Sequence, residues 1–349
     1  MGKMDNLEFV DLREELEKNH IAWDSPACCS SKESSYSLLR AQMQGTFQFS
    51  REGVWIKDFE HDKKCLSLLH LAKQKSCDLV LFPEYCISDQ VLWDIVSDEA
   101  LWPENRKLWV LPCQGMTKDQ FQAFIENLSK NNRVFLLDTA CTSRRVTFNH
   151  FVTVLFYCFL GYQGDASILC LVPQLKTQPM GDQDCLCEQA GMATGSVVFT
   201  LEQRLLTLLC ADSMNNELTW QRLQEEGLLM SGLTILHPQL NGHPKDQVFS
   251  RLRWELFERG TPGVYITCNW AAGTTLSSPE CQEAAKTIDL SWSCLYRKHA
   301  DDIFEKWERN YSLRRNNEAH GLFGTIMKPK RTEVWFSLSH EEALELRIP

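Results

Sequence analysis

The sequence predicts an α/β fold, because helix-like and strand-like patterns alternate along most of the chain. Residues 61–75 place apolar side chains at the i, i+3, i+4 and i+7 spacing of an amphipathic helix. Directly after them, residues 77–85 form an apolar run that ends at Pro83, which is typical of a buried strand. This alternation continues to about residue 275.

The same two patterns assign the remaining elements. Two apolar runs, residues 196–200 and 205–209, are separated by a polar turn, and the second run stops at Cys210. After residue 275 the chain is more charged, and Ser339 with Glu342 has the spacing of a capping box for a last short helix. The other expected helices cover residues 5–20, 119–131, 217–226, 246–259 and 298–316, and the other expected strands cover residues 37–42, 134–140, 148–160, 167–175, 233–237, 263–268, 322–327 and 333–338.

The bulk composition excludes several classes of function. The chain has 349 residues, a formal net charge of −10 and no long tract of Lys or Arg, so we expect no nucleic-acid partner. The longest apolar run, residues 151–160, is too short for a membrane span, which needs about 20 residues. The 15 cysteines are irregularly spaced and no signal-peptide pattern precedes them, so we expect reduced cysteines in a cytoplasmic protein.

We expect neither a metal nor a cofactor. Cys185 and Cys187 are close in sequence, but no further His or Cys lies near them at the spacing of a zinc site. His237 and His243 flank a turn rich in Pro and Gly. They could line a pocket or bind a metal, but histidines in such turns more commonly lie on the surface.

Three chemically reactive residues follow predicted strands. Glu84, Lys176 and Cys210 each lie at the C-terminal end of an apolar run, which is the edge where open α/β sheets bind ligands. A carboxylate can take the proton of a thiol as general base, and a lysine cation can stabilise the oxyanion that forms when the thiol attacks a carbonyl. The alternatives are a packed cysteine and a simple ion pair between Glu84 and Lys176.

The chain resembles the nitrilase, or carbon–nitrogen hydrolase, superfamily. The matching segments are DLVLFPE at residues 78–84, LVPQLK at 171–176 and TLLCAD at 207–212. Three further segments are similar to the family's pattern: EQAGMATG, which contains Glu188, GLTILHPQLN at 232–241 and GVYITCNWAAG at 263–273.

The resemblance implies a fold, a set of catalytic roles and a partner. The family fold is a four-layer α-β-β-α sandwich, and its members commonly form homodimers or larger homo-oligomers. Glu84 would be the general base, Lys176 the group that stabilises the oxyanion, and Cys210 the nucleophile. Glu188 would position Lys176 or the attacking water.

One departure from the family pattern concerns the residue after the nucleophile. The family usually has an aromatic side chain there, whereas this chain has Ala211, followed by a matching Asp212. The small side chain leaves the backbone N–H available and reshapes the pocket. We therefore expect Ala211 to affect the class of substrate rather than the chemistry. Ala211, Asn269 and His237 are the candidate substrate-binding residues, and Asn269 has the alternative role of satisfying a turn.

These observations predict a hydrolase domain at residues 36–275, between an N-terminal extension at 1–35 and a C-terminal helix and two-strand extension at 276–349. We expect a thiol-dependent hydrolase that cleaves a non-peptide C–N bond of a small-molecule amide through a thioester. The alternative is an interaction or regulatory protein of the same fold with little or no turnover, partnered with another enzyme for ammonia supply or bacterial defence.

Overall fold

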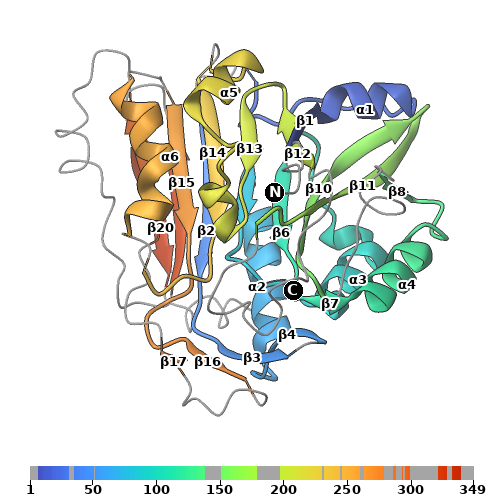
Figure 1. The fold of residues 1–349 in the computed structure, drawn as a ribbon. Helices are drawn as coiled ribbons and strands as arrows, with labels where there is room; N and C mark the ends of the chain where they lie inside the picture. Colours follow the sequence, from blue (N-terminus) through green and yellow to red (C-terminus); the bar gives the residue numbers. More distant parts are fainter. Residues whose placement is uncertain are drawn as a thin grey trace.

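Two β-sheets with helices beside them form the body of the protein in the computed structural model (Figure 1). The α/β class predicted from the sequence is confirmed. No helix in the described part of the chain is both long enough and apolar enough to cross a membrane. The structure describes residues 7–30, 35–50, 52–137, 151–178, 197–229, 232–243, 246–259, 263–278, 286–287, 293, 295–298, 321–327 and 332–338.

The larger sheet has eight strands in the order β20-β19-β2-β5-β6-β10-β11-β8. β2, β5 and β6 are parallel, while β10 is antiparallel to β6 and β11 is antiparallel to β10. β5 and β11 therefore run in the same direction and end at the same edge of the sheet. The strands are β2 (Tyr36–Gln42), β5 (Leu79–Leu81), β6 (Leu108–Pro112), β8 (Val134–Leu136), β10 (Val154–Gln163), β11 (Ala166–Leu175), β19 (Gly321–Met327) and β20 (Thr332–Leu338).

The second sheet has six strands in the order β1-β12-β13-β14-β15-β18. Its centre consists of the parallel strands β13, β14 and β15. The strands are β1 (Glu8–Asp11), β12 (Val197–Leu201), β13 (Leu205–Thr207), β14 (Leu233–Pro238), β15 (Gly263–Cys268) and β18 (Leu295–Lys298). Smaller pieces of sheet come from β3 (Thr46–Ser50), β4 (Gly53–Ile56), β7 (Met116–Thr117), β9 (Phe151–Val152), β16 (Thr275–Ser277) and β17 (Lys286–Thr287).

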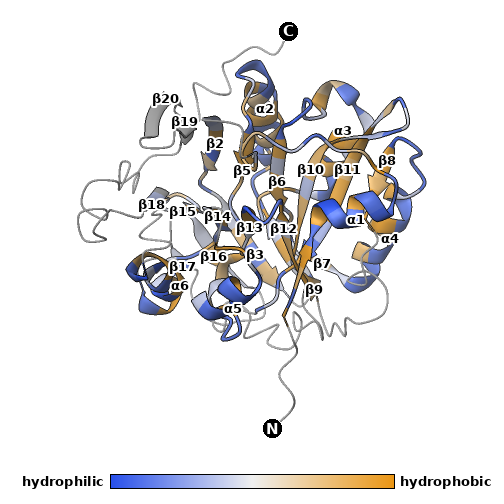
Figure 2. Cartoon of the chain, turned by 90° about the horizontal axis from the view of Figure 1, so that it is seen from above, coloured by the Kyte–Doolittle hydropathy of each residue, from blue (hydrophilic) through white to orange (hydrophobic). Residues whose placement is uncertain are grey.

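The helices bury apolar residues against the outer faces of the two sheets. α2 (His61–Gln74), α3 (Asp89–Ser97) and α4 (Lys118–Leu128) share a core with the eight-stranded sheet. α5 (Trp220–Glu225) and α6 (Gln247–Glu258) share a second hydrophobic core with the six-stranded sheet. Figure 2 shows hydrophobic strands on the inside and hydrophilic stretches on the outer helices.

A third core lies between the two sheets. β5 shows how one strand serves two cores: Val80 belongs to the cluster with the helices, whereas Leu79 and Leu81 belong to the cluster that contains Phe199 and Leu236 of the other sheet. Successive side chains of a strand point to opposite faces, so a strand buried on both faces is apolar without alternation. This explains the uninterrupted apolar runs in the sequence.

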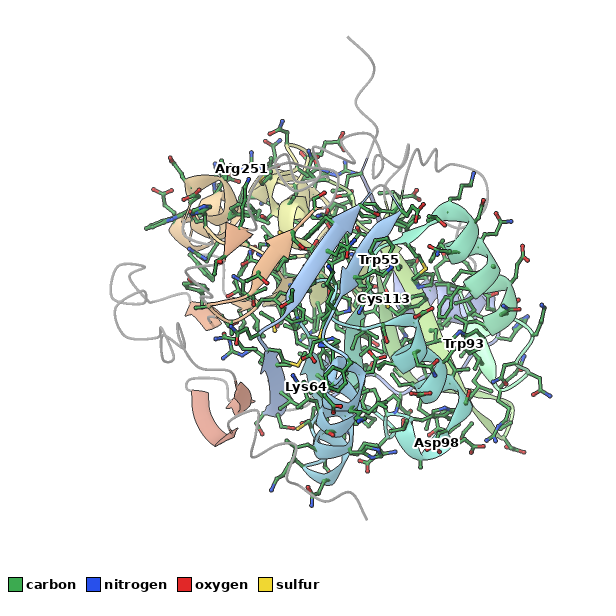
Figure 3. The ribbon with its side chains drawn as sticks, turned by 90° about the horizontal axis from the view of Figure 1, so that it is seen from below. Trp55, Lys64, Trp93, Asp98, Cys113 and Arg251 are labelled. Atoms are coloured by element: carbon green, nitrogen blue, oxygen red, sulfur yellow. The ribbon has the colours of Figure 1, made fainter. Side chains whose placement is uncertain are left out.

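Most of the elements expected between residues 36 and 275 are present, but several others had no prediction, among them β3, β4, α3 and β6. The predictions for α2, β2, β14 and β15 are confirmed to within one residue. α3 begins five residues after Glu84, and β6 is only five residues long. In α3, Trp93 (Figure 3) packs edge to face on Phe124 of α4, with ring centroids 5.4 Å apart.

Both terminal segments join the sheets. The helix expected over residues 5–20 is shorter, because Glu8–Asp11 pairs with β12 as β1 and the helix α1 covers only Leu12–Lys18. At the other end β19 pairs with β2 and β20 pairs with β19, so the C-terminal strands extend the eight-stranded sheet. The last short helix expected after Ser339 lies outside the described residues, and so does the helix expected at 298–316, except that Lys298 ends β18.

Gln174 links the two sheets through buried hydrogen bonds. Its Oε1 accepts from the Phe199 N–H at 2.9 Å and from the Tyr157 hydroxyl at 3.3 Å. Its Nε2 donates to the Thr207 carbonyl oxygen at 2.8 Å. Because Gln174 is on β11 while its backbone partners are on β12 and β13, this one amide fixes the sheets relative to each other.

Replacing Gln174 with Met leaves a backbone N–H and a backbone carbonyl without partners in the core. We expect the free energy of unfolding to fall by about 2–4 kcal/mol, since each orphaned buried group costs about 1–3 kcal/mol. Tyr157→Phe is the matched control, because it keeps the Gln174 amide and both of its bonds to backbone groups, and it should cost about 1 kcal/mol. Urea denaturation measures both, and equal losses in the two variants would contradict this role.

Candidate active site

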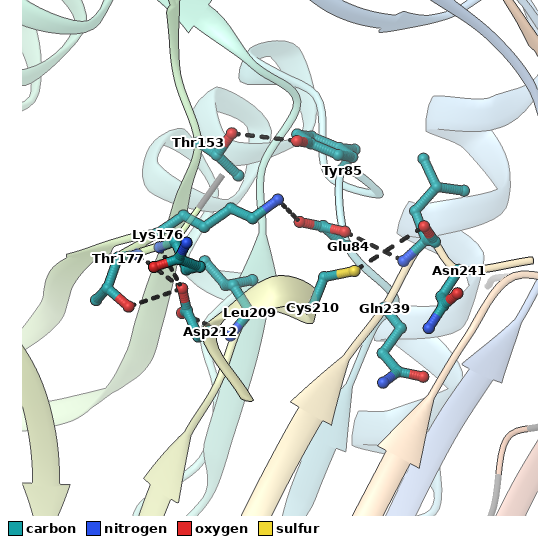
Figure 4. A network of polar contacts seen from close by, with 12 residues as sticks. Glu84, Tyr85, Thr153, Lys176, Thr177, Leu209, Cys210, Asp212, Gln239 and Asn241 are labelled. Carbon is teal, nitrogen blue, oxygen red and sulfur yellow. Dashed lines mark hydrogen bonds and ion pairs between the residues drawn. The ribbon is translucent and has the colours of Figure 1, made fainter. Parts of the chain in front are cut away.

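Glu84, Lys176 and Cys210 meet at one place, although the chain separates them widely (Figure 4). Glu84 lies three residues beyond β5, Lys176 follows β11 directly, and Cys210 lies three residues beyond β13. The first two come from the eight-stranded sheet and the third from the six-stranded sheet. The strands therefore deliver a carboxylate, an amine and a thiol to a common edge.

Glu84 and Lys176 form a buried ion pair. Lys176 Nζ lies 3.0 Å from Glu84 Oε1, and the two side chains are only 6% and 1% exposed. The other carboxylate oxygen, Oε2, accepts a hydrogen bond from the Leu240 N–H at 3.1 Å. Buried charges are stable only when paired and hydrogen-bonded, so each group of the pair needs the other.

The thiol of Cys210 lies beside this ion pair. Its Sγ is a hydrogen-bonding neighbour of the Glu84 carboxylate and lies 4.0 Å from the carbonyl oxygen of Leu240. Leu240 thus offers its N–H to the acid and its carbonyl to the thiol. Cys210 is fully buried among the described residues.

The resting thiol is neutral. Burial raises the pKa of Cys210 well above its usual range, and the negative charge of Glu84 raises it further, while Lys176 and the Leu240 backbone act in the opposite direction. Glu84 is therefore placed to accept the thiol proton as the sulfur attacks, rather than to hold a thiolate in advance.

Cys210 has a strained backbone. Its φ is +40°, a left-handed conformation that is uncommon for a residue with a side chain and costs about 1–3 kcal/mol. It begins the short 3-10 helix η2 (Cys210–Met214). The sharp turn from strand to helix presents the sulfur at the sheet edge. Ala211 is the second residue of this helix, where an N–H has no acceptor within the helix.

Asp212 ties this turn to the lysine segment. Its Oδ1 accepts from the Thr177 N–H at 2.7 Å, the Thr177 hydroxyl at 2.9 Å and the Gln178 N–H at 3.0 Å. Its Oδ2 accepts from the Leu209 N–H at 2.9 Å. Burial raises the pKa of Asp212, and these hydrogen bonds and Lys176 oppose that rise. The sequence identified Asp212 only as a match to a family pattern; its positioning role is visible only in three dimensions.

His237 holds the Cys210 backbone through a hydrogen bond. Its Nε2–H donates to the Cys210 carbonyl oxygen at 2.8 Å, and its Nδ1 accepts from the Tyr265 hydroxyl at 2.8 Å, which fixes the neutral tautomer. Burial lowers the pKa of His237 to about 4. The expectation of a surface turn is wrong for His237, which is 1% exposed, and holds for His243, which is exposed. A contact between His237 and a substrate stays a prediction.

Asn269 holds the turn that carries Leu240. Its Oδ1 accepts from the Asn241 N–H at 3.0 Å and its Nδ2 donates to the Asn241 carbonyl at 2.7 Å. Of the two roles left open for Asn269, the structure shows the turn role. Substrate contacts by Asn269 and Ala211 stay predictions, and Glu188 lies outside the described residues.

Two aromatic residues complete the site and had no assigned role there in the sequence. The Trp270 Nε1–H donates to the Glu84 carbonyl oxygen at 2.7 Å. Lys176 Nζ lies 5.8 Å from the centre of the Tyr85 ring, within reach of a cation–π attraction. Both residues follow motif residues directly, which is the only signal the sequence offers for them.

Comparisons with known proteins give weak structural likenesses alone. No protein-family model matches the chain, and no curated protein matches it. Among solved structures, the chain is similar to an amidase from Nesterenkonia sp., with 11% identity, a TM-score of 0.37, and coverage of 90% of this chain and 94% of the other. The chain is also similar to Nit3 of Saccharomyces cerevisiae, a member of branch 10 of the nitrilase superfamily. The identity is 11%, the TM-score is 0.37, and the match covers 85% of this chain and 92% of Nit3.

A third similar structure is a glutamine-dependent NAD(+) synthetase from Cytophaga hutchinsonii, with 11% identity and a TM-score of 0.38. It is matched over 76% of this chain and 39% of the synthetase. Function is not inferred from likenesses this low, because one fold can host many activities. The functional assignment therefore rests on the geometry of Glu84, Lys176 and Cys210.

The buried His237 predicts how stability depends on pH. Its pKa is about 4 in the folded protein and 6.5 for an unperturbed histidine. Above pH 6.5 both states hold a neutral ring, whereas below it only the unfolded state takes up the proton. Stability is therefore lost as the pH falls from 6.5 to 4, by about 2 kcal/mol at pH 5.

His237→Gln removes this titration. Urea denaturation at pH 7 and pH 5 should show a loss of unfolding free energy that is about 2 kcal/mol smaller in the variant than in the wild type. The comparison uses the change with pH, so the hydrogen bonds that the variant also loses at both pH values do not obscure it. The same loss in both proteins would refute a neutral buried imidazole.

Proposed function

We propose that the protein is a thiol-dependent hydrolase of a non-peptide C–N bond, acting on a small-molecule amide. The observation that supports this is the meeting of the Cys210 thiol, the Glu84 carboxylate and the Lys176 ammonium in one buried network. A thiol alone is commonly a packing group, and an ion pair alone is commonly structural. Together, within hydrogen-bonding range, they are a nucleophile, its base and a cation for the oxyanion.

The reaction follows from these groups. The Cys210 sulfur forms a bond to the amide carbon as its proton passes to Glu84. The Lys176 ammonium and the Ala211 N–H stabilise the resulting oxyanion. Protonated Glu84 then returns the proton to the leaving nitrogen, and the C–N bond breaks to leave a thioester. Glu84 next takes a proton from water, and the water oxygen forms a bond to the thioester carbon. The C–S bond then breaks, and Glu84 returns the proton to the Cys210 sulfur, which releases a carboxylic acid and restores the thiol.

The layer order of the fold belongs to the same proposal. We propose a four-layer α-β-β-α sandwich, supported by three separate apolar cores: one between helices and the eight-stranded sheet, one between the sheets, and one between the six-stranded sheet and its helices. In this arrangement the site lies at the sheet edge where β5, β11 and β13 end.

Ammonia release from a panel of small primary amides tests the activity. Cys210→Ala should lower kcat/KM by at least about 1,000-fold for any substrate found, since removing a nucleophile removes the chemical pathway. Cys158→Ala is the matched control, because Cys158 is equally buried but lies in β10 away from the site. Intact-mass measurement should also detect an acyl adduct in the wild type and none in Cys210→Ala. Full activity of Cys210→Ala would refute the proposal. The non-catalytic alternative instead predicts no turnover by the wild type or by any variant.

A double-variant cycle separates catalysis from structure at the ion pair. Because the pair is buried, removing either charge should also destabilise the fold. Lys176→Met and Glu84→Gln should each lower the unfolding free energy by about 3–5 kcal/mol, because each leaves one buried charge unpaired.

The double variant Glu84→Gln with Lys176→Met removes both charges and should regain most of that stability. All three variants should lack activity, including the stable double variant. Urea denaturation and ammonia release measure the two properties separately. A double variant that regains both stability and activity would show that the pair is only structural.

A further inference from the structure

His61, Cys65 and Cys86 form a second buried cluster of reactive side chains. His61 and Cys65 are four residues apart on α2, so they lie on one face of that helix. Cys86 lies in the segment between β5 and α3, two residues after Glu84. The exposed fractions of the three residues are 2%, 0% and 0%.

The three ligand atoms have the spacing of a metal's coordination shell. His61 Nε2 lies 3.4 Å from Cys65 Sγ and 3.9 Å from Cys86 Sγ, and the two sulfurs are 3.9 Å apart. Tetrahedral bonds of about 2.3 Å to sulfur and 2.0 Å to nitrogen put sulfurs about 3.8 Å apart and nitrogen about 3.5 Å from sulfur. The observed edges match these values to within about 0.4 Å. A disulfide would need the sulfurs to approach to about 2.05 Å.

Charge and burial select the kind of ion. Two thiolates and a neutral imidazole carry two negative charges, so a divalent cation makes the buried site neutral. Thiolate and imidazole ligands are typical of Zn²⁺, whereas Ca²⁺ and Mg²⁺ require oxygen. His61 Nδ1 is also buried and has no hydrogen-bond partner among the described residues.

In the metal-free protein the three side chains interact through hydrogen bonds and charge. Burial opposes the charged forms. The hydrogen bond with Cys86 and the charge of His61 nevertheless lower the pKa of Cys65 to about 6, and Cys65 in turn raises the pKa of His61 to about 9. His61 Nε2 then donates to the Cys86 carbonyl oxygen at 2.6 Å. A metal ion would displace the protons of His61 and Cys86 and replace this hydrogen bond.

We propose that His61, Cys65 and Cys86 bind one Zn²⁺ ion per chain, at a site that braces the segment carrying Glu84. This departs from the sequence, which indicated no metal. Two connections link the site to Glu84. Cys86 is two residues along the chain, and the His61 ring lies 5.8 Å from the ring of Trp270, whose N–H holds the Glu84 carbonyl.

Titration of the reduced, chelator-treated full-length protein tests the proposal. Zn²⁺, in competition with a chromophoric chelator, should bind with a stoichiometry of one per chain and raise the melting temperature. Co²⁺, used as a spectroscopic probe, should give a thiolate-to-cobalt charge-transfer band. These measurements do not depend on hydrolase activity.

Cys65→Ala and Cys86→Ala should weaken Zn²⁺ binding by at least about 100-fold and abolish the charge-transfer band. Cys158→Ala and Cys210→Ala are the controls and should bind as the wild type does, so the metal site and the nucleophile are tested apart. If either ligand variant fails to fold, the wild-type stoichiometry and cobalt spectrum still decide.

Absence of binding by the folded wild type would overturn the proposal. So would unchanged binding by Cys65→Ala and Cys86→Ala, since it would place the ion at other cysteines, such as Cys185 and Cys187. A Cys65–Cys86 disulfide in protein prepared under reductant, seen as the loss of two hydrogens in the intact mass, would overturn it as well.

Discussion

The ion pair between Glu84 and Lys176 is the interaction on which the site depends. Its two charges are almost completely removed from water and lie 3.0 Å apart, so neither is stable alone. One comes from the segment after β5 and the other from the end of β11, and the pair therefore requires the order of the eight-stranded sheet. The thiol beside it comes from the other sheet, so it also requires the two sheets to pack in one register, which Gln174 helps to fix.

The sequence predicted the parts of this arrangement that depend on local pattern. The apolar run before Glu84 and the run before Cys210 end where the side chains leave the sheet, and strand periodicity is enough to see that. It also predicted that three residues far apart in the chain share one edge, because parallel strands end on the same side. The ion pair and the neighbouring thiol confirm the proximity of the three groups.

Other parts of the structure cannot be predicted from local sequence periodicity. β6 is only five residues long and follows a stretch without periodicity, so its central position depends on tertiary pairing. Glu8–Asp11 was expected to be helical because of its charge, yet it pairs with β12, which shows tertiary contacts overriding local preference. His237 and Asn269 were judged from the turn near them, whereas the fold buries both and uses them to hold backbone.

Leu240 has a consequence for how the site varies. Its contribution is made entirely by the main chain: the amide hydrogen goes to the acid and the carbonyl oxygen faces the sulfur. Any residue except proline supplies those two atoms. The Leu240 side chain is buried in the core, so packing rather than the chemistry of the site limits which residues can stand at position 240. A search that aligns reactive side chains alone would overlook one of the groups that contact the acid and the thiol.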